Sequence, residues 1–83
     1  MKKRSVVTVI NDICRIAPEL SEPLEDKLAY TAPELLWTKV TEFINHNVVA
    51  DPDDPHAVAI YAALMGISNR RMRKMMRERE RRT

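Results

Sequence analysis

The chain has 83 residues, 45% of them hydrophobic, with one glycine, five prolines and one cysteine. A chain of this length forms one small domain with a modest core, which excludes proteins that enclose a large substrate cavity. The apolar content excludes a disordered chain, and the shortage of turn residues excludes a many-stranded β fold. We therefore expect residues 1–83 to form a single all-α domain, a small bundle of four to five short helices.

The formal net charge of +2 is unevenly distributed. Residues 1–68 hold 6 basic and 10 acidic side chains, net −4, whereas residues 69–83 hold 8 basic and 2 acidic side chains, net +6. A concentration of positive charge at one end of a chain attracts an anionic partner, most commonly a nucleic acid, although an acidic protein or a membrane surface would serve as well. The simplest alternative is a solvated C-terminal helix without a partner.

Cysteine usage and the N-terminus predict the compartment. Cys14 is the single cysteine and cannot form an intrachain disulfide, which favours a reducing cytoplasm. The basic start resembles that of a signal peptide, but Asn11, Asp12 and Arg15 interrupt the apolar stretch that follows. The sequence has no apolar run of transmembrane length, so we expect a cytoplasmic protein with no membrane partner.

Prolines divide the first half of the chain into predicted helices. Apolar residues recur at intervals of three and four from Val6 onward, which indicates an amphipathic helix that ends near Pro18. The alternation of Val6, Thr8 and Ile10 leaves a short N-terminal strand as the alternative.

Two more helix starts follow in this half. Ser21 is predicted to cap a short helix with Pro23 in its first turn. The stretch "TAPE" has the pattern of a capping box, in which the side chains of Thr31 and Glu34 bond to each other's backbone N–H groups. It predicts a helix that opens there and runs to about Asn47.

The apolar face of this predicted helix includes Trp37 and Phe43, which we expect in the core. Residues 1–50 carry a large apolar surface for such a short domain. We therefore expect this helical body to include a dimerisation surface.

The stretch "DPDDP", residues 51–55, separates the body from residues 56–82. Asp54 followed by Pro55 is a favourable N-cap and first-turn pair for another helix. The predicted buried side of that helix comprises Ala57, Ile60, Tyr61, Leu64 and Met65.

Gly66 decides whether residues 56–82 form one helix or two. Inside a continuous helix, glycine costs about 1 kcal/mol relative to alanine, and Ser68 prefers caps over interiors. At a turn, Gly66 can adopt a positive φ, Ile67 can enter the core and Ser68 can cap a second helix. The sequence therefore predicts a helix, a turn and a second helix.

These residues resemble the helix-turn-helix motif of bacterial and phage DNA-binding regulators. That motif has a small residue four before a turn glycine, apolar residues on both sides of the glycine, a polar cap, and two apolar positions three apart. The matching residues, within residues 58–77, are Ala62, Met65, Gly66, Ile67, Ser68, Met72 and Met75. Val58 departs from the motif's usual glutamine or threonine, and the two later methionines replace the usual β-branched residues. The resemblance implies DNA binding by a homodimer that reads two half-sites.

With Met72, Met75 and Met76 turned inward, the second helix would present a polar, mostly basic outer side. The predicted nucleic-acid contacts are Ser68, Asn69, Arg70, Arg73, Lys74, Arg77, Arg81 and Arg82. Arginine can bind guanine and asparagine can bind adenine through paired hydrogen bonds, whereas arginine and lysine also neutralise phosphates. The alternative is that Glu78 pairs with Lys74 and Arg82 at helical spacing.

Candidates for catalysis and metal binding are weak. His46 and His56 lie on either side of a proline-rich turn, and their spacing does not predict a zinc site. The loop that contains Asp51 and two further aspartates lacks the glycine and the distal glutamate of an EF-hand calcium site. The sequence shows no nucleophile beside a base and no phosphate-binding glycine loop, so we expect no enzyme activity, metal or cofactor.

The sequence therefore predicts a small DNA-binding regulator of transcription or replication, from a bacterium or a mobile element. Two alternatives remain. In one, an arginine-rich C-terminal helix binds structured RNA. In the other, the chain is a small adaptor or inhibitor that docks on another protein.

Overall fold

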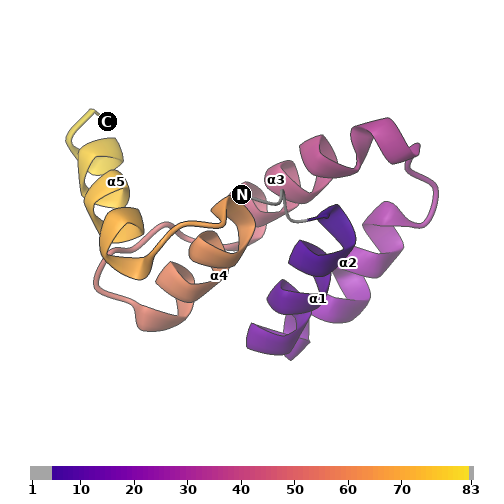
Figure 1. The fold of residues 1–83 in the computed structure, drawn as a ribbon, viewed down its shortest axis with the longest axis horizontal. Helices are drawn as coiled ribbons and strands as arrows, with labels where there is room; N and C mark the ends of the chain where they lie inside the picture. The colour runs from indigo at the N-terminus through magenta and orange to yellow at the C-terminus, as the bar shows by residue number, and fades with distance from the viewer. Residues whose placement is uncertain (1–4, 83) are drawn as a thin grey trace.

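The computed structural model describes residues 5–82, with the side chain of Arg82 outside the described part, and contains five α-helices over this range (Figure 1). They are α1 (Val6–Ile16), α2 (Ser21–Leu28), α3 (Leu36–Asn47), α4 (Pro55–Met65) and α5 (Asn69–Arg82). The basic start, residues 1–4, lies outside the described residues. Residues 5–82 contain no strand, so the all-α prediction is confirmed and the strand alternative for the N-terminus is wrong.

The helices are arranged so that α5 lies at one end of the long axis of the molecule (Figure 1). Helix α4 packs against α1 on one side and α5 on the other, and α2 packs against α3. This arrangement leaves most of the surface of α5 exposed to solvent, at the opposite end from α2.

The core is built around α4. Its residues are buried on most sides because other helices cover it, as expected for a helix that is apolar nearly all round. The buried core comprises Val9, Ile13, Ala17, Leu24, Val40, Phe43, Ile44, Ala57, Val58, Ile60, Tyr61, Ala63, Leu64, Met72 and Met76. It therefore includes residues from all five helices described in residues 5–82.

The two aromatic residues predicted for the core of α3 have different environments. Phe43 is buried, as predicted, with 7% of its surface exposed. Trp37 is 43% exposed, so that prediction is wrong. Trp37 lies in the first turn of α3, at the edge of an apolar face whose centre is occupied by Val40 and Ile44.

Both predicted caps in the middle of the chain are wrong. A 3-10 turn, η1 (Pro18–Leu20), runs directly into α2, so Ser21 is already helical and does not act as the cap. The Thr31 hydroxyl donates to the Lys27 carbonyl at 3.0 Å, so it serves the end of α2 and does not form the capping box. A second 3-10 turn, η2 (Pro33–Leu35), follows, and α3 begins later than predicted.

The other predicted boundaries are confirmed. Helix α1 ends at Ile16, just before Pro18, and α3 ends at Asn47. At the start of α4, the Asp54 carboxylate accepts the His56 backbone N–H at 3.0 Å, and Pro55 is the first helical residue.

Candidate nucleic-acid interface

A left-handed turn at Gly66 sets the direction of α5. Gly66 has φ 68° and ψ 27°, and it is the one residue with positive φ among the residues that the structure describes. Its backbone N–H donates to the Ala62 carbonyl at 2.7 Å, which closes the last turn of α4. Glycine takes this conformation without the steric cost that a β-carbon adds. The predicted turn is therefore confirmed.

Ser68 and Ile67 complete the connection to α5. The backbone N–H of Arg71 donates to the Ser68 hydroxyl at 3.4 Å, a long and hence weak capping bond. The backbone N–H of Met72 donates to the Ser68 carbonyl at 2.9 Å. Ile67 is partly buried against the core, as predicted. The second helix consequently begins at Asn69.

The methionines of this region divide into buried and exposed pairs. Met72 and Met76 are 3% and 2% exposed, whereas Met75 and Met65 are 40% and 51% exposed. The predicted burial of Met75 and Met65 is therefore wrong. Helix α5 packs mainly on α4, along a stripe that Met72 and Met76 fill, and Met75 lies at its edge. Met65 is the last residue of α4, where the chain turns away.

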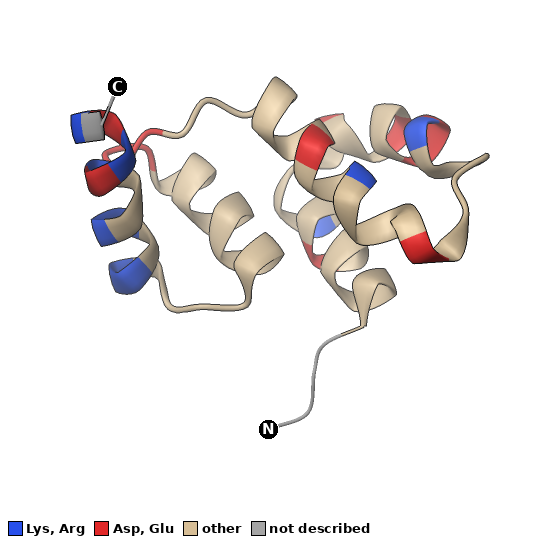
Figure 2. Cartoon of the chain, turned by 90° about the horizontal axis from the view of Figure 1, so that it is seen from above, with Lys and Arg blue, Asp and Glu red and all other residues tan. Residues whose placement is uncertain are grey.

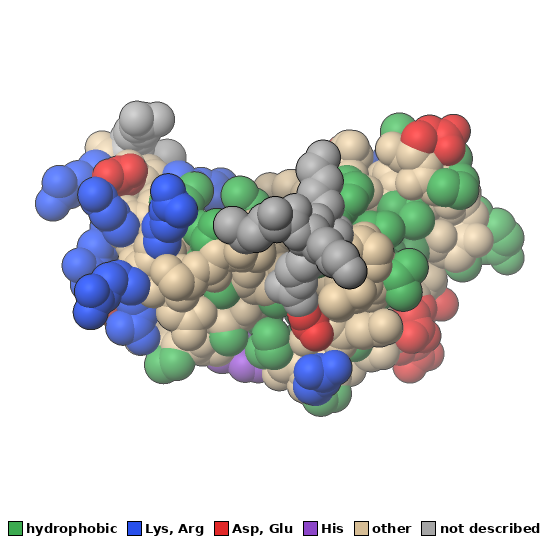
Figure 3. Space-filling model, viewed as in Figure 1, with side chains coloured by type: hydrophobic (Ala, Val, Ile, Leu, Met, Phe, Trp, Pro, Cys, Tyr) green, Lys and Arg blue, Asp and Glu red, His purple; other side chains and the backbone are tan. Residues whose placement is uncertain are grey.

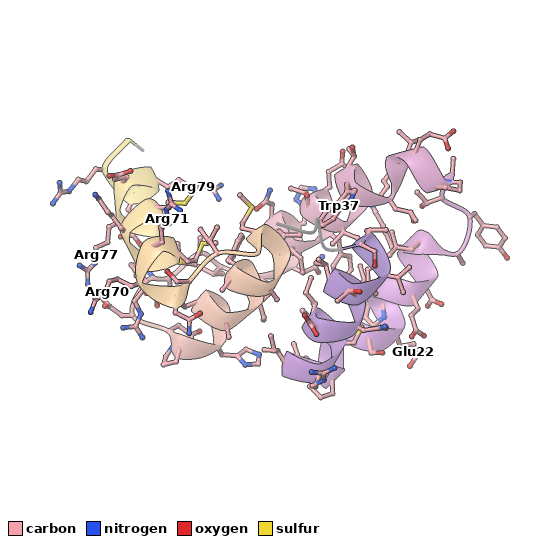
Figure 4. All side chains as sticks on the ribbon, in the orientation of Figure 1. Glu22, Trp37, Arg70, Arg71, Arg77 and Arg79 are labelled. Carbon is pink, nitrogen blue, oxygen red and sulfur yellow. The ribbon has the colours of Figure 1, made fainter. Side chains whose placement is uncertain are left out.

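One face of α5 carries cations alone. Arg70, Lys74, Arg77 and Arg81 recur every three or four residues and are all exposed; we call them the outer row. Figure 2 shows the basic residues of α5 on the end of the molecule, and Figure 4 shows Arg70 and Arg77 pointing away from α4. Among the described side chains, no carboxylate lies within 4.0 Å of the outer row, and Glu78 does not pair with Lys74.

Asn69 lies on a different edge of α5. It lines a shallow depression of about 380 Å³ together with Ala62 of α4 and Asp12 and Arg15 of α1. Arg15 is 78% exposed and lies 3.7 Å from Asp12. Arg73 follows Asn69 by one helical turn and is exposed on the same edge. The depression thus contains Arg15, which sequence reasoning did not include, as well as Asn69, but there the Asp12 carboxylate lies beside Arg15.

The remaining edge of α5 combines charge with apolar surface. Arg71, Met75 and Arg79 are each four residues apart and therefore lie on one line along the helix. Figure 4 shows Arg71 and Arg79 on the side facing the body of the protein. Sequence reasoning assigned no role to Arg71 or Arg79, although their spacing from Met75 was visible. We call this line the groove edge.

The groove edge borders an apolar pocket of about 350 Å³ between α3, α4 and α5, which we call the methionine groove. Its lining residues are Thr41, Asn45, Tyr61, Leu64, Met65, Met72, Met75, Met76 and Arg79. Figure 3 shows hydrophobic side chains directly beside the basic end of the molecule, with most of the visible acidic side chains at the other end. An apolar groove and a basic surface therefore share one helix.

Tyr61 connects the floor of the groove to the end of α3. Its hydroxyl lies 3.2 Å from the Asn45 side-chain oxygen and 3.1 Å from the Val48 carbonyl, and it can donate to either. Burial raises the pKa of Tyr61, and the nearby positive charge of Arg79 partly lowers it. The tyrosine therefore stays a neutral hydrogen-bond donor and holds α4 against α3.

The two histidines do not form a reactive cluster. His56 Nε2 lies 3.2 Å from a carboxylate oxygen of Glu19, an exposed contact that becomes an ion pair when the histidine is protonated. His46 is exposed on α3. Within residues 5–82, no group of three or more histidine, cysteine, aspartate or glutamate side chains is arranged to hold a metal ion.

The described helices are all too short or too polar to cross a bilayer. All of the predicted nucleic-acid contacts whose side chains are described are exposed, including Ser68 before α5. The exposed contacts on α5 are Arg70, Arg73, Lys74, Arg77 and Arg81. Asn69 is exposed in the depression that α1 also lines, and the side chain of Arg82 lies outside the described part.

Comparison of the chain with protein-family models, curated proteins and solved structures finds no match.

Proposed function

We propose that this chain is a small regulator that binds duplex DNA with α5. The observation that carries the proposal is the outer row, whose cations have no carboxylate within 4.0 Å among the described side chains. Met72 and Met76 anchor the opposite side of the same helix in the core. An α-helix about 10–12 Å in diameter fits the major groove of B-DNA, which is about 12 Å wide.

The charge distribution supports an orientation for the bound DNA. Residues 69–83 carry a net charge of +6 and residues 1–68 a net charge of −4. Phosphates are attracted by the first segment and repelled by the second, so the duplex would approach the α5 end of the molecule. Displacement of counterions from the phosphates by arginine and lysine supplies most of the affinity of such contacts.

Base reading is assigned to the first turns of α5. Asn69, Arg70 and Arg73 lie near its N-terminus, the part of a recognition helix that contacts base edges. Arg81 lies two turns further along and would contact phosphates only.

A homodimer would present two copies of α5 to half-sites about 34–36 Å apart. Leu35 at the end of η2 and Trp37 in the first turn of α3 are 47% and 43% exposed, and they supply apolar surface for it within residues 1–50. Sedimentation equilibrium of the parent and of Trp37→Ser tests this arrangement. We expect the substitution to weaken dimerisation, and a monomeric parent at all concentrations would contradict the dimer.

The binding test uses fluorescence anisotropy of a labelled random-sequence duplex across a salt series. We expect binding at low salt, with a logarithmic salt slope of about −0.9 for each phosphate contact. Arg77→Ala/Arg81→Ala should flatten the slope by up to about two units, whereas Lys27→Ala on α2 should leave it unchanged. Absence of binding at low salt would refute the proposal. Tighter binding to an RNA hairpin than to the duplex would instead assign α5 to RNA.

A second measurement separates base reading from phosphate attraction. After selection of a preferred duplex from a random pool, alanine at Asn69, Arg70 or Arg73 should relax the sequence preference by about 1–3 kcal/mol per lost contact. Arg81→Ala should weaken binding to preferred and random duplexes equally. If all these variants weaken binding without regard to sequence, α5 is a non-specific polycation.

A further inference from the structure

The methionine groove is a second surface of α5, on the side away from the outer row. Buried Tyr61, Leu64, Met72 and Met76 form its floor, and exposed Met65 and Met75 stand at its rim. Methionine has an unbranched, polarisable side chain that adapts its shape to a partner, which is why it is common at protein-binding surfaces. The groove is therefore suited to apolar side chains supplied from outside.

The charges at the rim define the partner further. Arg71 and Arg79 lie one helical turn on either side of Met75, so each end of the apolar strip is close to a cation. Arg79 also lines the groove itself. A partner that covers Met75 would desolvate part of the exposed Arg71 guanidinium, which is costly unless the partner brings a carboxylate to meet it. The positive charge of Arg79 favours the same acidic partner.

The same charges disfavour a second copy seated symmetrically in the groove. A two-fold contact through this face would bring two α5 helices together, each within a segment of net charge +6. Repulsion between like charges opposes that contact, whereas attraction between opposite charges favours an acidic occupant.

We propose that the methionine groove binds an acidic amphipathic helix of another protein. Leucine, isoleucine or phenylalanine side chains at helical spacing would enter the groove between α3, α4 and α5, and flanking carboxylates would meet Arg71 and Arg79. This interaction goes beyond the proposed DNA binding and does not depend on it. Because the groove and the outer row are on different sides of α5, one chain can hold a nucleic acid and a protein together.

The experiment uses the full chain and a fluorescein-labelled synthetic peptide of about 16 residues, long enough for four helical turns. The peptide carries leucines at positions i, i+3, i+4 and i+7 and glutamates elsewhere on its surface. Two control peptides have the same leucines scattered along the sequence, or lysine in place of glutamate. We expect the acidic amphipathic peptide to bind at least about tenfold more tightly than either control.

Variants of the chain locate the binding site. Met65→Gln/Met75→Gln changes exposed side chains and should preserve the fold, weaken peptide binding at least about tenfold, and leave duplex DNA binding unchanged. Arg71→Glu should weaken binding of the glutamate peptide and strengthen binding of the lysine peptide. The matched control, Arg70→Glu/Arg77→Glu, should reduce DNA binding while the leucine-dependent preference for the amphipathic peptide persists.

Three results would overturn the proposal. The first is equal binding of the scattered and amphipathic peptides, and the second is peptide binding that is unaffected by Met65→Gln/Met75→Gln. The third is concentration-dependent self-association that this double substitution abolishes, which would assign the groove to a second copy of the chain. DNA binding is measured separately, so its loss or retention does not decide any of these results.

Discussion

The outer row and the groove edge of α5 come from one run of basic residues, yet they form two chemically different surfaces. The outer row presents cations alone to solvent. On the groove edge, Met75 lies between Arg71 and Arg79, beside an apolar pocket. Helical periodicity separates residues that are adjacent in sequence, and only the edge beside α3 and α4 acquires apolar neighbours. A charge run therefore describes a binding surface poorly until its residues are assigned to faces.

The largest expected effect comes from methionine substitutions on the two sides of this boundary. Met72→Ala removes a side chain that is 3% exposed and should lower the free energy of unfolding by about 2–5 kcal/mol. Met75→Ala makes the same chemical change at a side chain that is 40% exposed and should cost less than about 1 kcal/mol. Urea denaturation of both variants measures the difference. Equal losses would mean that both methionines pack in the core and that the groove is closed.

The next effect concerns the turn that orients both surfaces. Gly66→Val places a β-branched residue at a φ of 68° and should destabilise the fold by more than about 1 kcal/mol. Gly66→Asn is the matched control, because asparagine tolerates the left-handed region and should cost less. Thermal melts of the two variants test this order. An unchanged or raised midpoint for Gly66→Val would indicate a continuous helix through residue 66.

The smallest effect is electrostatic and distinguishes Arg79 from Arg77. Burial raises the pKa of Tyr61 above its ordinary value of 10.0, and Arg79 partly offsets the rise. Because the folded state holds this proton more tightly than the unfolded state, the stabilisation is present below pH 10 and is lost as the pH rises through the folded pKa.

Arg79→Gln should therefore raise the pKa of Tyr61 further, whereas Arg77→Gln should leave it unchanged. Tyrosinate absorbance measures it in a Tyr30→Phe background, which leaves Tyr61 as the remaining tyrosine. Identical titrations of the two glutamine variants would place Arg79 away from the groove.

Sequence reasoning predicted the features that depend on a residue's own conformational preferences. Helix α1 ends at Ile16, shortly before Pro18, and Asp54 and Pro55 start α4. Gly66 and Ser68 separate α4 from α5. Proline restricts φ, aspartate accepts a nearby N–H, and glycine tolerates a positive φ in any protein. Such signals act over a few residues, so they could be recognised without knowledge of the fold.

The tertiary structure decided the features for which one residue type has several suitable environments. Thr31 could cap the helix after it, but its hydroxyl bonds to the end of α2 because η2 delays the start of α3. Met72 and Met75 both fit an apolar stripe, and the narrow contact with α4 buries only the first. Sequence alone thus determined an all-α chain with a basic final helix after a glycine turn. Which faces of that helix meet the core, the groove and the solvent depended on how the other helices pack, because burial is a property of neighbours distant in sequence.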